Sequence, residues 1–161
     1  MDNIGYNVQQ AIANNGVGEA VELERAEAWL TRMVTPSKNA TEPPSTVLPN
    51  VVTYTTLISA YANRGDISRV EHLLTTMQNE GVLPNTVTYT AVIKCCVKAK
   101  DVAAAMVWFE LMQNEGIPVN EVTYRWIQHG HENAGNWAEA EWCRRQRQVF
   151  RFRKTKLYEY L

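Results

Sequence analysis

The segment from Val51 to Asn85 reads VVTYTTLISAYANRGDISRVEHLLTTMQNEGVLPN, and the segment from Thr86 to Asn120 follows it without a gap as TVTYTAVIKCCVKAKDVAAAMVWFELMQNEGIPVN. The strings VTY and MQNEG recur 35 residues apart in the two segments. A third segment opens at Glu121 with EVTYRWIQHGHENAGNWAEAE and carries VTY at the same spacing. Three identical starts at one spacing indicate a repeat architecture, in which each repeat is one supersecondary unit.

Each repeat is predicted to form a helix, a turn and a second helix. In both halves of a repeat the apolar residues fall at spacings of three and four, which is the one-sided stripe of an amphipathic helix. The stripe residues are Tyr54, Leu57, Ile58 and Tyr61 with counterparts Tyr89, Val92, Ile93 and Cys96, then Val70, Leu73, Leu74 and Met77 with counterparts Ala105, Trp108, Phe109 and Met112. Gly81 and Gly116 follow the second helices as stop signals. Because one helical hairpin cannot bury both stripes, we predict an all-α fold in which neighbouring repeats stack into a right-handed α-solenoid.

The repeat divides the chain into four units. Units of standard length cover residues 51–85, 86–120 and 121–155, and the last of these is degenerate and runs into a basic C-terminal helix over residues 144–161. Residues 1–50 form a divergent first unit, in which GYNVQQAIANNG resembles a first helix and AEAWLTRM a second helix. We expect this unit to have a lengthened turn between its helices, roughly from Val17 to Arg25, and a polar insert with prolines over residues 35–49.

Bulk composition is that of a soluble globular protein. The chain has 161 residues, of which 45% are hydrophobic and 20% charged, and it contains no run of about 18 apolar residues that would predict membrane insertion. Its three cysteines form no C-x-x-C pair, so neither a disulfide framework nor a thiolate metal site is expected. The amino terminus lacks the arginines of a transit peptide, and because the repeat pattern is already present from Ile4 we expect a fragment or a mature form.

The repeat residues carry a family resemblance. VTYTTLISAYANRG followed by MQNEGVLPN resembles the pattern of the pentatricopeptide repeat family, whereas the Trp, Leu-Gly and Ala-x-x-x-Phe signals of tetratricopeptide repeats are missing at this register. A protein adaptor of the tetratricopeptide type is therefore the least favoured alternative. The pentatricopeptide resemblance implies single-stranded RNA as the partner, with one base read per repeat by a few side chains on the concave face of the solenoid.

The resemblance also implies which side chains read the bases. Thr55 would act with Asn85, and Thr90 with Asn120, and a Thr/Asn pair implies adenine. In the first unit Asn7 would act with Asn50, a combination that the family associates with cytosine. The pair Arg125 and Thr155 of the last full unit fits no common combination. The residues implied to wedge between bases are Val52, Val87 and Val122. As an alternative, Asn85 and Asn120 lie where a helix begins and would serve only as helix caps.

Cations for the phosphate backbone are unevenly distributed. Lys98 aligns with the family's phosphate-contacting lysine, and Arg125 is expected to contact a phosphate or to stack on a base. Residues 1–143 hold 9 Lys and Arg against 16 Asp and Glu, whereas the tail RRQRQVFRFRKTK is basic with interleaved aromatic residues. The tail arginines expected to contact phosphate are Arg144, Arg145, Arg147, Arg151 and Arg153. The alternative is that the tail is a solvated helix that caps the array.

No catalytic centre, metal site or cofactor is expected from the sequence. The zinc deaminase of some family members needs H-x-E together with C-x-x-C, and His129, His131 and Glu132 have no such cysteine partners. His129 and His131 also point to different sides of a helix, so they cannot share a metal ion at the usual spacing of three or four residues.

The function implied by the resemblance is sequence-selective binding of single-stranded RNA in organellar RNA metabolism, in a mitochondrion or a chloroplast. The alternative is a non-catalytic scaffold subunit of a larger ribonucleoprotein assembly with protein partners, such as an organellar ribosome. The shortness of the array, its acidic body and the insert favour this alternative.

Overall fold

The computed structural model describes residues 19–34 and 48–159, and this part of the chain contains seven helices and no strand. The helices are α2 (Glu19–Val34), α3 (Val51–Arg64), α4 (Ile67–Asn79), α5 (Thr86–Lys98), α6 (Val102–Asn114), α7 (Glu121–Asn133) and α8 (Trp137–Glu159). No helix among these residues is both long enough and apolar enough to cross a membrane.

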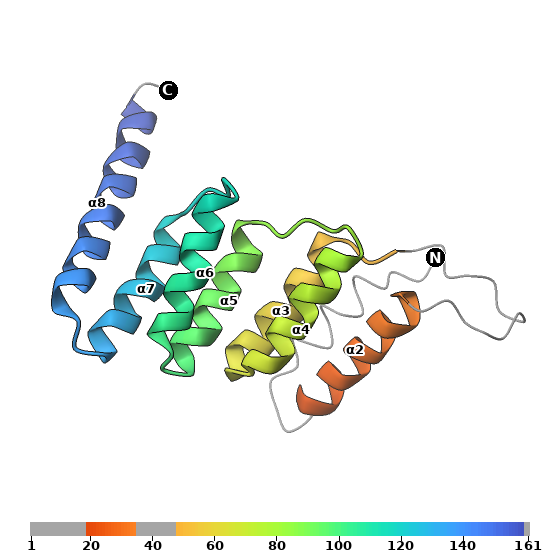
Figure 1. Ribbon diagram of the computed structural model, residues 1–161. Coiled ribbons are helices and arrows are strands. Elements are labelled where there is room, and N and C mark those ends of the chain that lie inside the picture. The colour runs from red at the N-terminus through yellow and green to blue at the C-terminus, as the bar shows by residue number, and fades with distance from the viewer. Residues whose placement is uncertain (1–18, 35–47, 160–161) are drawn as a thin grey trace, which may run out of the picture.

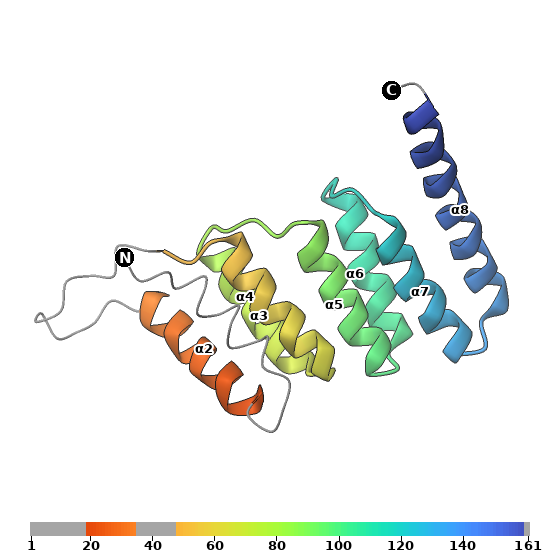
Figure 2. The ribbon, with the colours of Figure 1, turned by 180° about the vertical axis from the view of Figure 1, so that it is seen from behind.

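The helices stack in chain order into an elongated array (Figure 1). Helices α3, α5 and α7 are the first helices of three successive pairs and begin 35 residues apart, at Val51, Thr86 and Glu121. Each is followed by its second helix, α4, α6 or α8, and α2 lies at the opposite end of the array from α8 (Figure 2). The predicted all-α solenoid is therefore confirmed.

Residues with special backbone roles set the ends of the helices. Asn50, Asn85 and Asn120 are the N-caps of α3, α5 and α7, and their side-chain oxygens accept hydrogen bonds from backbone N–H groups of the first turn. Gly81 and Gly116 follow α4 and α6 with φ of 71° and 70°, a conformation that a side chain disfavours. The chain thus turns at the same place in successive repeats.

The core is a continuous layer formed by the predicted stripes. All sixteen stripe residues except Trp108 are buried, and Trp108 is partly buried against the same core. Tyr54, Leu57 and Ile58 of α3 are fully excluded from solvent, as are Tyr89 and Ile93 of α5. Because these side chains lie between successive helix pairs, the stacking of neighbours buries the apolar surface that one hairpin would leave exposed.

One prediction for the first unit was wrong. Helix α2 begins at Glu19, so most of the segment predicted as a turn from Val17 to Arg25 is helical. The sequence EAVELERAEAWL consists mainly of strong helix formers, and Leu23, Ala26 and Leu30 form a buried stripe at helical spacing. The helix therefore includes Leu23, which packs on the core, and begins one turn earlier at Glu19. The segment GYNVQQAIANNG and residues 35–47 of the predicted insert lie outside the described residues.

Helix α8 is longer than the other second helices. It continues without a break for 23 residues. In both views its C-terminal part extends past the N-terminal end of α7, because the two helices run in opposite directions (Figures 1 and 2). The basic segment predicted from Arg144 onward is thus part of the second helix of the last pair.

A paired substitution tests the stacking layer. Leu57→Ala, at a side chain with no exposed surface, is expected to lower the free energy of unfolding by about 2–5 kcal/mol, because it leaves a cavity between helix pairs. Leu83→Ala is the matched control, since Leu83 is 83% exposed and its loss is expected to change stability by less than about 0.5 kcal/mol. Urea unfolding followed by circular dichroism measures both, and equal losses would contradict the packing described.

Candidate nucleic-acid interface

The first-helix face, defined as the surface formed by α3, α5 and α7, carries most of the predicted reading residues. Thr55 of α3 lies with its Oγ1 atom 2.9 Å from the Oγ1 atom of Thr88 in α5. The Thr88 hydroxyl donates a hydrogen bond of 3.1 Å to the Oδ1 atom of Asn85. Thr55 and Asn85 are far apart in the sequence, yet one bridging threonine connects them.

The same cluster recurs in the next repeat. The Oγ1 atom of Thr90 lies 2.8 Å from that of Thr123 in α7, and the Thr123 hydroxyl donates to the Oδ1 atom of Asn120 at 3.1 Å. The structure therefore joins both predicted pairs through a residue that the sequence analysis did not single out. The threonine of each VTY string was the available signal, since it recurs at the repeat spacing.

The hydrogen-bond directions in the first cluster follow from the helix cap. The Asn85 Oδ1 atom accepts bonds of 3.0 Å from the backbone N–H groups of Val87 and Thr88, which identifies it as the oxygen of the amide. Thr88 has one hydroxyl proton, and in the arrangement in which this proton goes to the Asn85 oxygen, Thr55 donates its own proton to Thr88. Thr55 is left with lone pairs that accept hydrogen bonds.

Capping leaves part of each asparagine available. The Nδ2 groups of Asn85 and Asn120 have no hydrogen-bond acceptor within the described part of the chain. The cap uses only the amide oxygen, so the capping role and the reading role predicted for these residues are compatible. Accessibility differs between the two threonines, because Thr55 is partly buried whereas Thr90 is only 9% exposed.

Three valines stand exposed at one position of the repeat. Val52, Val87 and Val122 lie in the first turns of α3, α5 and α7 and are 57%, 56% and 42% exposed. Single exposed apolar side chains are normal on protein surfaces, but a periodic series along one face is better suited to contact with a ligand that has the same period.

Two cations of α5 bond to the C-terminal part of the neighbouring α3. Lys98 donates from Nζ to the backbone oxygen of Asn63 at 2.6 Å, and Lys94 donates to the side-chain oxygen of the same residue. Burial lowers the pKa of Lys94, and repulsion from Lys98 and Arg125 lowers it further. Lys94 was not among the predicted site residues, although it lies one helical turn before Lys98 and so on the same side of α5.

The arginines of α8 are held by carboxylates of α7 and α8. Arg144 lies 3.3 Å from Glu132 and 3.0 Å from Glu141, and Arg145 lies 3.6 Å from Glu141. Arg147 and Arg151 both contact Glu121, at 3.5 Å and 3.0 Å, and these arginines hold the pKa of the Glu121 carboxyl below its usual value. The structure thus places four of the predicted phosphate contacts in ion pairs within the last helix pair.

The predicted site residues of the first unit and of the tail are described only in part. Asn7 lies outside the described residues, and the side chains of Arg153 and Thr155 are likewise undescribed. Asn50 caps α3, accepting bonds of 2.9 Å and 3.1 Å from the N–H groups of Val52 and Thr53.

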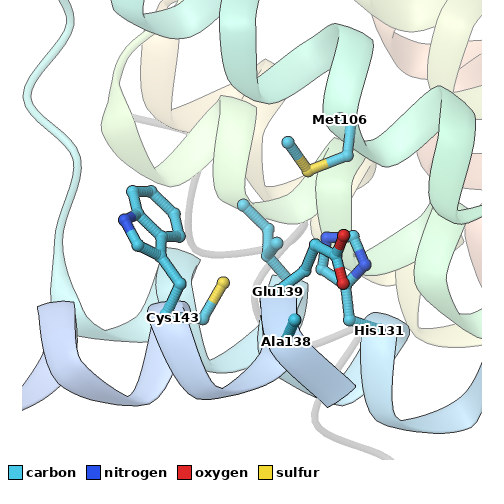
Figure 3. Close-up of a pocket in the computed structure, with 7 residues that line it drawn as sticks. Met106, His131, Ala138, Glu139 and Cys143 are labelled. Atoms are coloured by element: carbon cyan, nitrogen blue, oxygen red, sulfur yellow. The ribbon is translucent and has the colours of Figure 1, made fainter. Parts of the chain in front are cut away.

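A mainly apolar pocket is lined by residues of α6, α7 and α8 and by none of the threonine clusters. It has a volume of about 330 Å³ and is lined by Met106, Ile127, His131, Ala138, Glu139, Trp142 and Cys143, with Met106 of α6 facing residues of α7 and α8 (Figure 3). Burial raises the pKa of the Cys143 thiol to about 11, so the thiol is protonated and a poor nucleophile at neutral pH. Among the described residues no group of three or more His, Cys, Asp or Glu side chains could hold a metal ion.

Solved structures with the same architecture are helical repeat proteins. The maize pentatricopeptide repeat protein PPR10 in complex with an 18-nucleotide psaJ RNA element aligns with a TM-score of 0.66 and 23% identity over 78% of this chain and 17% of that chain. The PPR domain of Arabidopsis thaliana protein-only RNase P 1, in complex with tRNA, aligns with a TM-score of 0.67 and 13% identity over 91% of this chain and 69% of that chain. This chain thus spans about a sixth of the length of PPR10. At these identities the likeness concerns the fold.

A family model gives the assignment that structural likeness alone does not. No curated protein matches this chain. The model of the PPR repeat family matches residues 49–98 and again residues 84–133, and together these matches span more than half of the chain. The matched segments contain α3 to α7, which carry both threonine clusters and the exposed valines. The chain therefore belongs to the pentatricopeptide repeat family.

Proposed function

We propose that this chain is a non-catalytic module that binds single-stranded RNA along the first-helix face and reads two successive bases. Thr55 with Asn85 reads the first base, and Thr90 with Asn120 reads the second. The observation that carries the proposal is the recurrence of one hydrogen-bonded Thr–Thr–Asn cluster at the junctions of α3 with α5 and of α5 with α7.

The chemistry of each cluster fits the edge of adenine. The first threonine offers a hydrogen-bond acceptor, and the asparagine offers the donor Nδ2 group. The Watson–Crick edge of adenine presents a donor amino group beside the acceptor N1, which complements this pair. Cytosine presents a similar pattern on a smaller ring, so a test of selectivity needs both bases. The family resemblance implies adenine for a Thr/Asn pair, and we therefore propose two adjacent adenines as the target.

Other features of the face support binding of a strand. The exposed Val52, Val87 and Val122 provide apolar surfaces against which base faces pack. Lys94 on α5 lies near both Lys98 and Arg125, and these three cations supply positive charge for the RNA backbone. PPR10 and the PPR domain of protein-only RNase P 1 were each solved in complex with RNA, and this supports the same class of partner here.

We place this activity in organellar RNA metabolism, in a mitochondrion or a chloroplast, as membership of the family suggests. A second candidate function is a scaffold within a larger ribonucleoprotein assembly. The exposed apolar side chains Val107, Trp137 and Trp142 on α6 and α8 favour it, because they provide a surface for protein partners. Stoichiometric protein partners, together with unchanged function in Thr55→Ala/Thr90→Ala, would support the scaffold.

The reading pairs are tested by changing their threonines. Thr55→Asn/Thr90→Asn is expected to lower the preference for an adenine-centred over a uridine-centred RNA by roughly fivefold or more, since hydrogen bonds contribute about 0.5–1.5 kcal/mol each. The resulting Asn/Asn pairs are expected to favour cytosine. Fluorescence anisotropy across a salt series measures both preferences.

Thr75→Asn is the matched control for this change, because Thr75 lies exposed on α4 and bonds to the backbone oxygen of Glu71. It is expected to bind like the parent chain. Binding that is absent, or equal for all four bases in the parent chain, would contradict the proposal.

The bridging threonines are predicted to be positioning residues. Thr88→Val/Thr123→Val removes the hydroxyls that orient Thr55 and Thr90, so base preference is expected to fall while binding to RNA of any sequence persists. Thr88→Ser/Thr123→Ser keeps the hydroxyls and is expected to restore the preference. If Val and Ser variants discriminate equally well, the bridges have no part in reading. Circular dichroism of each variant checks that the helices are retained.

A further inference from the structure

We propose that a pocket at the α8 end of the first-helix face binds one further nucleotide of the same RNA strand, by stacking and phosphate contact and without reading the base. This end pocket has a volume of about 370 Å³ and is lined by Arg125, Trp126, Gln128, His129, Glu132 and Arg147. The inference rests on the proposed function, since it concerns the nucleotide that follows the two read by the threonine clusters.

The end pocket continues the line of the reading positions. Arg125 occupies in α7 the place that Thr55 holds in α3 and Thr90 in α5, at successive intervals of 35 residues. A strand that passes Thr55 and Thr90 therefore reaches Arg125 next. An arginine cannot form the Thr–Thr–Asn cluster, so this position holds a nucleotide by a different chemistry.

An aromatic wall is available for stacking. Trp126 is partly buried, and the Nζ atom of Lys94 in the neighbouring α5 lies 5.3 Å from the centre of its ring. The centre of the His129 ring, also on α7, lies 6.2 Å from the centre of the Trp126 ring in an edge-to-face arrangement. The indole is therefore contacted by side chains of both α5 and α7. Stacking on an aromatic ring is tolerant of base identity because every base has a π face.

Positive charge at this junction is not balanced by protein carboxylates. Lys98 and Arg125 both lie close enough to Lys94 to repel its charge, and within the described part of the chain none of the three forms an ion pair. Clustered like charges destabilise one another at short range. A phosphate placed among them would relieve this repulsion, which favours an anionic ligand.

The acidic group of the end pocket is already engaged. Glu132 accepts hydrogen bonds from Gln128 at 2.7 Å and from Arg144 at 3.3 Å, so its charge is offset within the protein. Arg147 donates to Gln128 at 2.8 Å, while its buried Nε group has no hydrogen-bond partner among the described residues. The pocket therefore retains the exposed Arg125 guanidinium and an indole, a combination that suits a nucleotide. Its volume lies at the lower end of small-ligand sites, roughly 300–1,000 Å³.

Mononucleotides test the end pocket directly in the full chain. The indole N–H signal of Trp126 is assigned in an NMR spectrum by its loss in Trp126→Phe. Titration with adenosine monophosphate and with uridine monophosphate is expected to shift this signal to a similar extent, while inorganic phosphate shifts it less. The Trp137 signal serves as the internal control, since Trp137 is exposed on α8 and does not line the pocket. No shift with either nucleotide, or an equal shift with phosphate alone, would overturn the proposal.

RNA binding separates this inference from the proposed function. Trp126→Leu keeps an apolar side chain without a ring and is expected to weaken binding of adenine-centred and uridine-centred RNAs by the same factor, roughly 5- to 100-fold. Arg125→Gln is expected to reduce the slope of log affinity against log salt by about 0.7. Trp137→Ala is expected to bind like the parent chain.

The outcomes distinguish the two proposals. If the parent chain prefers adenine and Trp126→Leu binds RNA as tightly as the parent chain, the proposal for the end pocket is wrong and base reading stands. If Trp126→Leu changes the ratio between the two RNAs, the pocket reads a base and this inference is overturned. If no RNA binds to the parent chain and no nucleotide shifts the Trp126 signal, both proposals fail.

Discussion

The burial of apolar stripes between successive helix pairs is the interaction on which the rest of the structure depends. A pair such as α3 and α4 presents Tyr54, Ile58 and their neighbours to the next pair, and stacking removes these side chains from water. The stacking also fixes the register between α3 and α5. Because of that register, the hydroxyl of Thr55 meets that of Thr88, and the same geometry brings Thr90 to Thr123. The Thr–Thr–Asn clusters are thus a consequence of core packing.

Charge is distributed so that few cations remain for a polyanion. The acidic residues of α7 and α8 hold Arg144, Arg147 and Arg151, and these pairs stabilise the last helix pair at the end of the array. Lys94 and Lys98 on α5 and Arg125 on α7 lie without such partners in the described part of the chain. RNA held by this face would depend on a small cluster of charges and on stacking, so its affinity would be modest and sensitive to salt.

The last pair departs from the others in a consistent way. Arg144 and Arg147 occupy in α8 the places that Phe109 and Met112 hold in the core layer of α6. Instead of presenting an apolar stripe to a further helix pair, α8 lays charged side chains over the acidic side of α7. It also forms one side of the end pocket.

The sequence by itself determined the repeat, the number and order of helices from Val51 onward, and nearly all of the buried stripe, because periodic spacing reports which side of a helix meets the core. It also offered helix capping as the alternative role of Asn85 and Asn120, and both residues do cap helices, since capping is local. It was wrong about the segment before Ala26, where Leu23 joins the core and prolongs α2. Only the tertiary structure decided that Thr88 bridges Thr55 to Asn85 and that Lys94 lies over Trp126. These contacts join residues of different helices, and no local pattern encodes the register at which two helices pack.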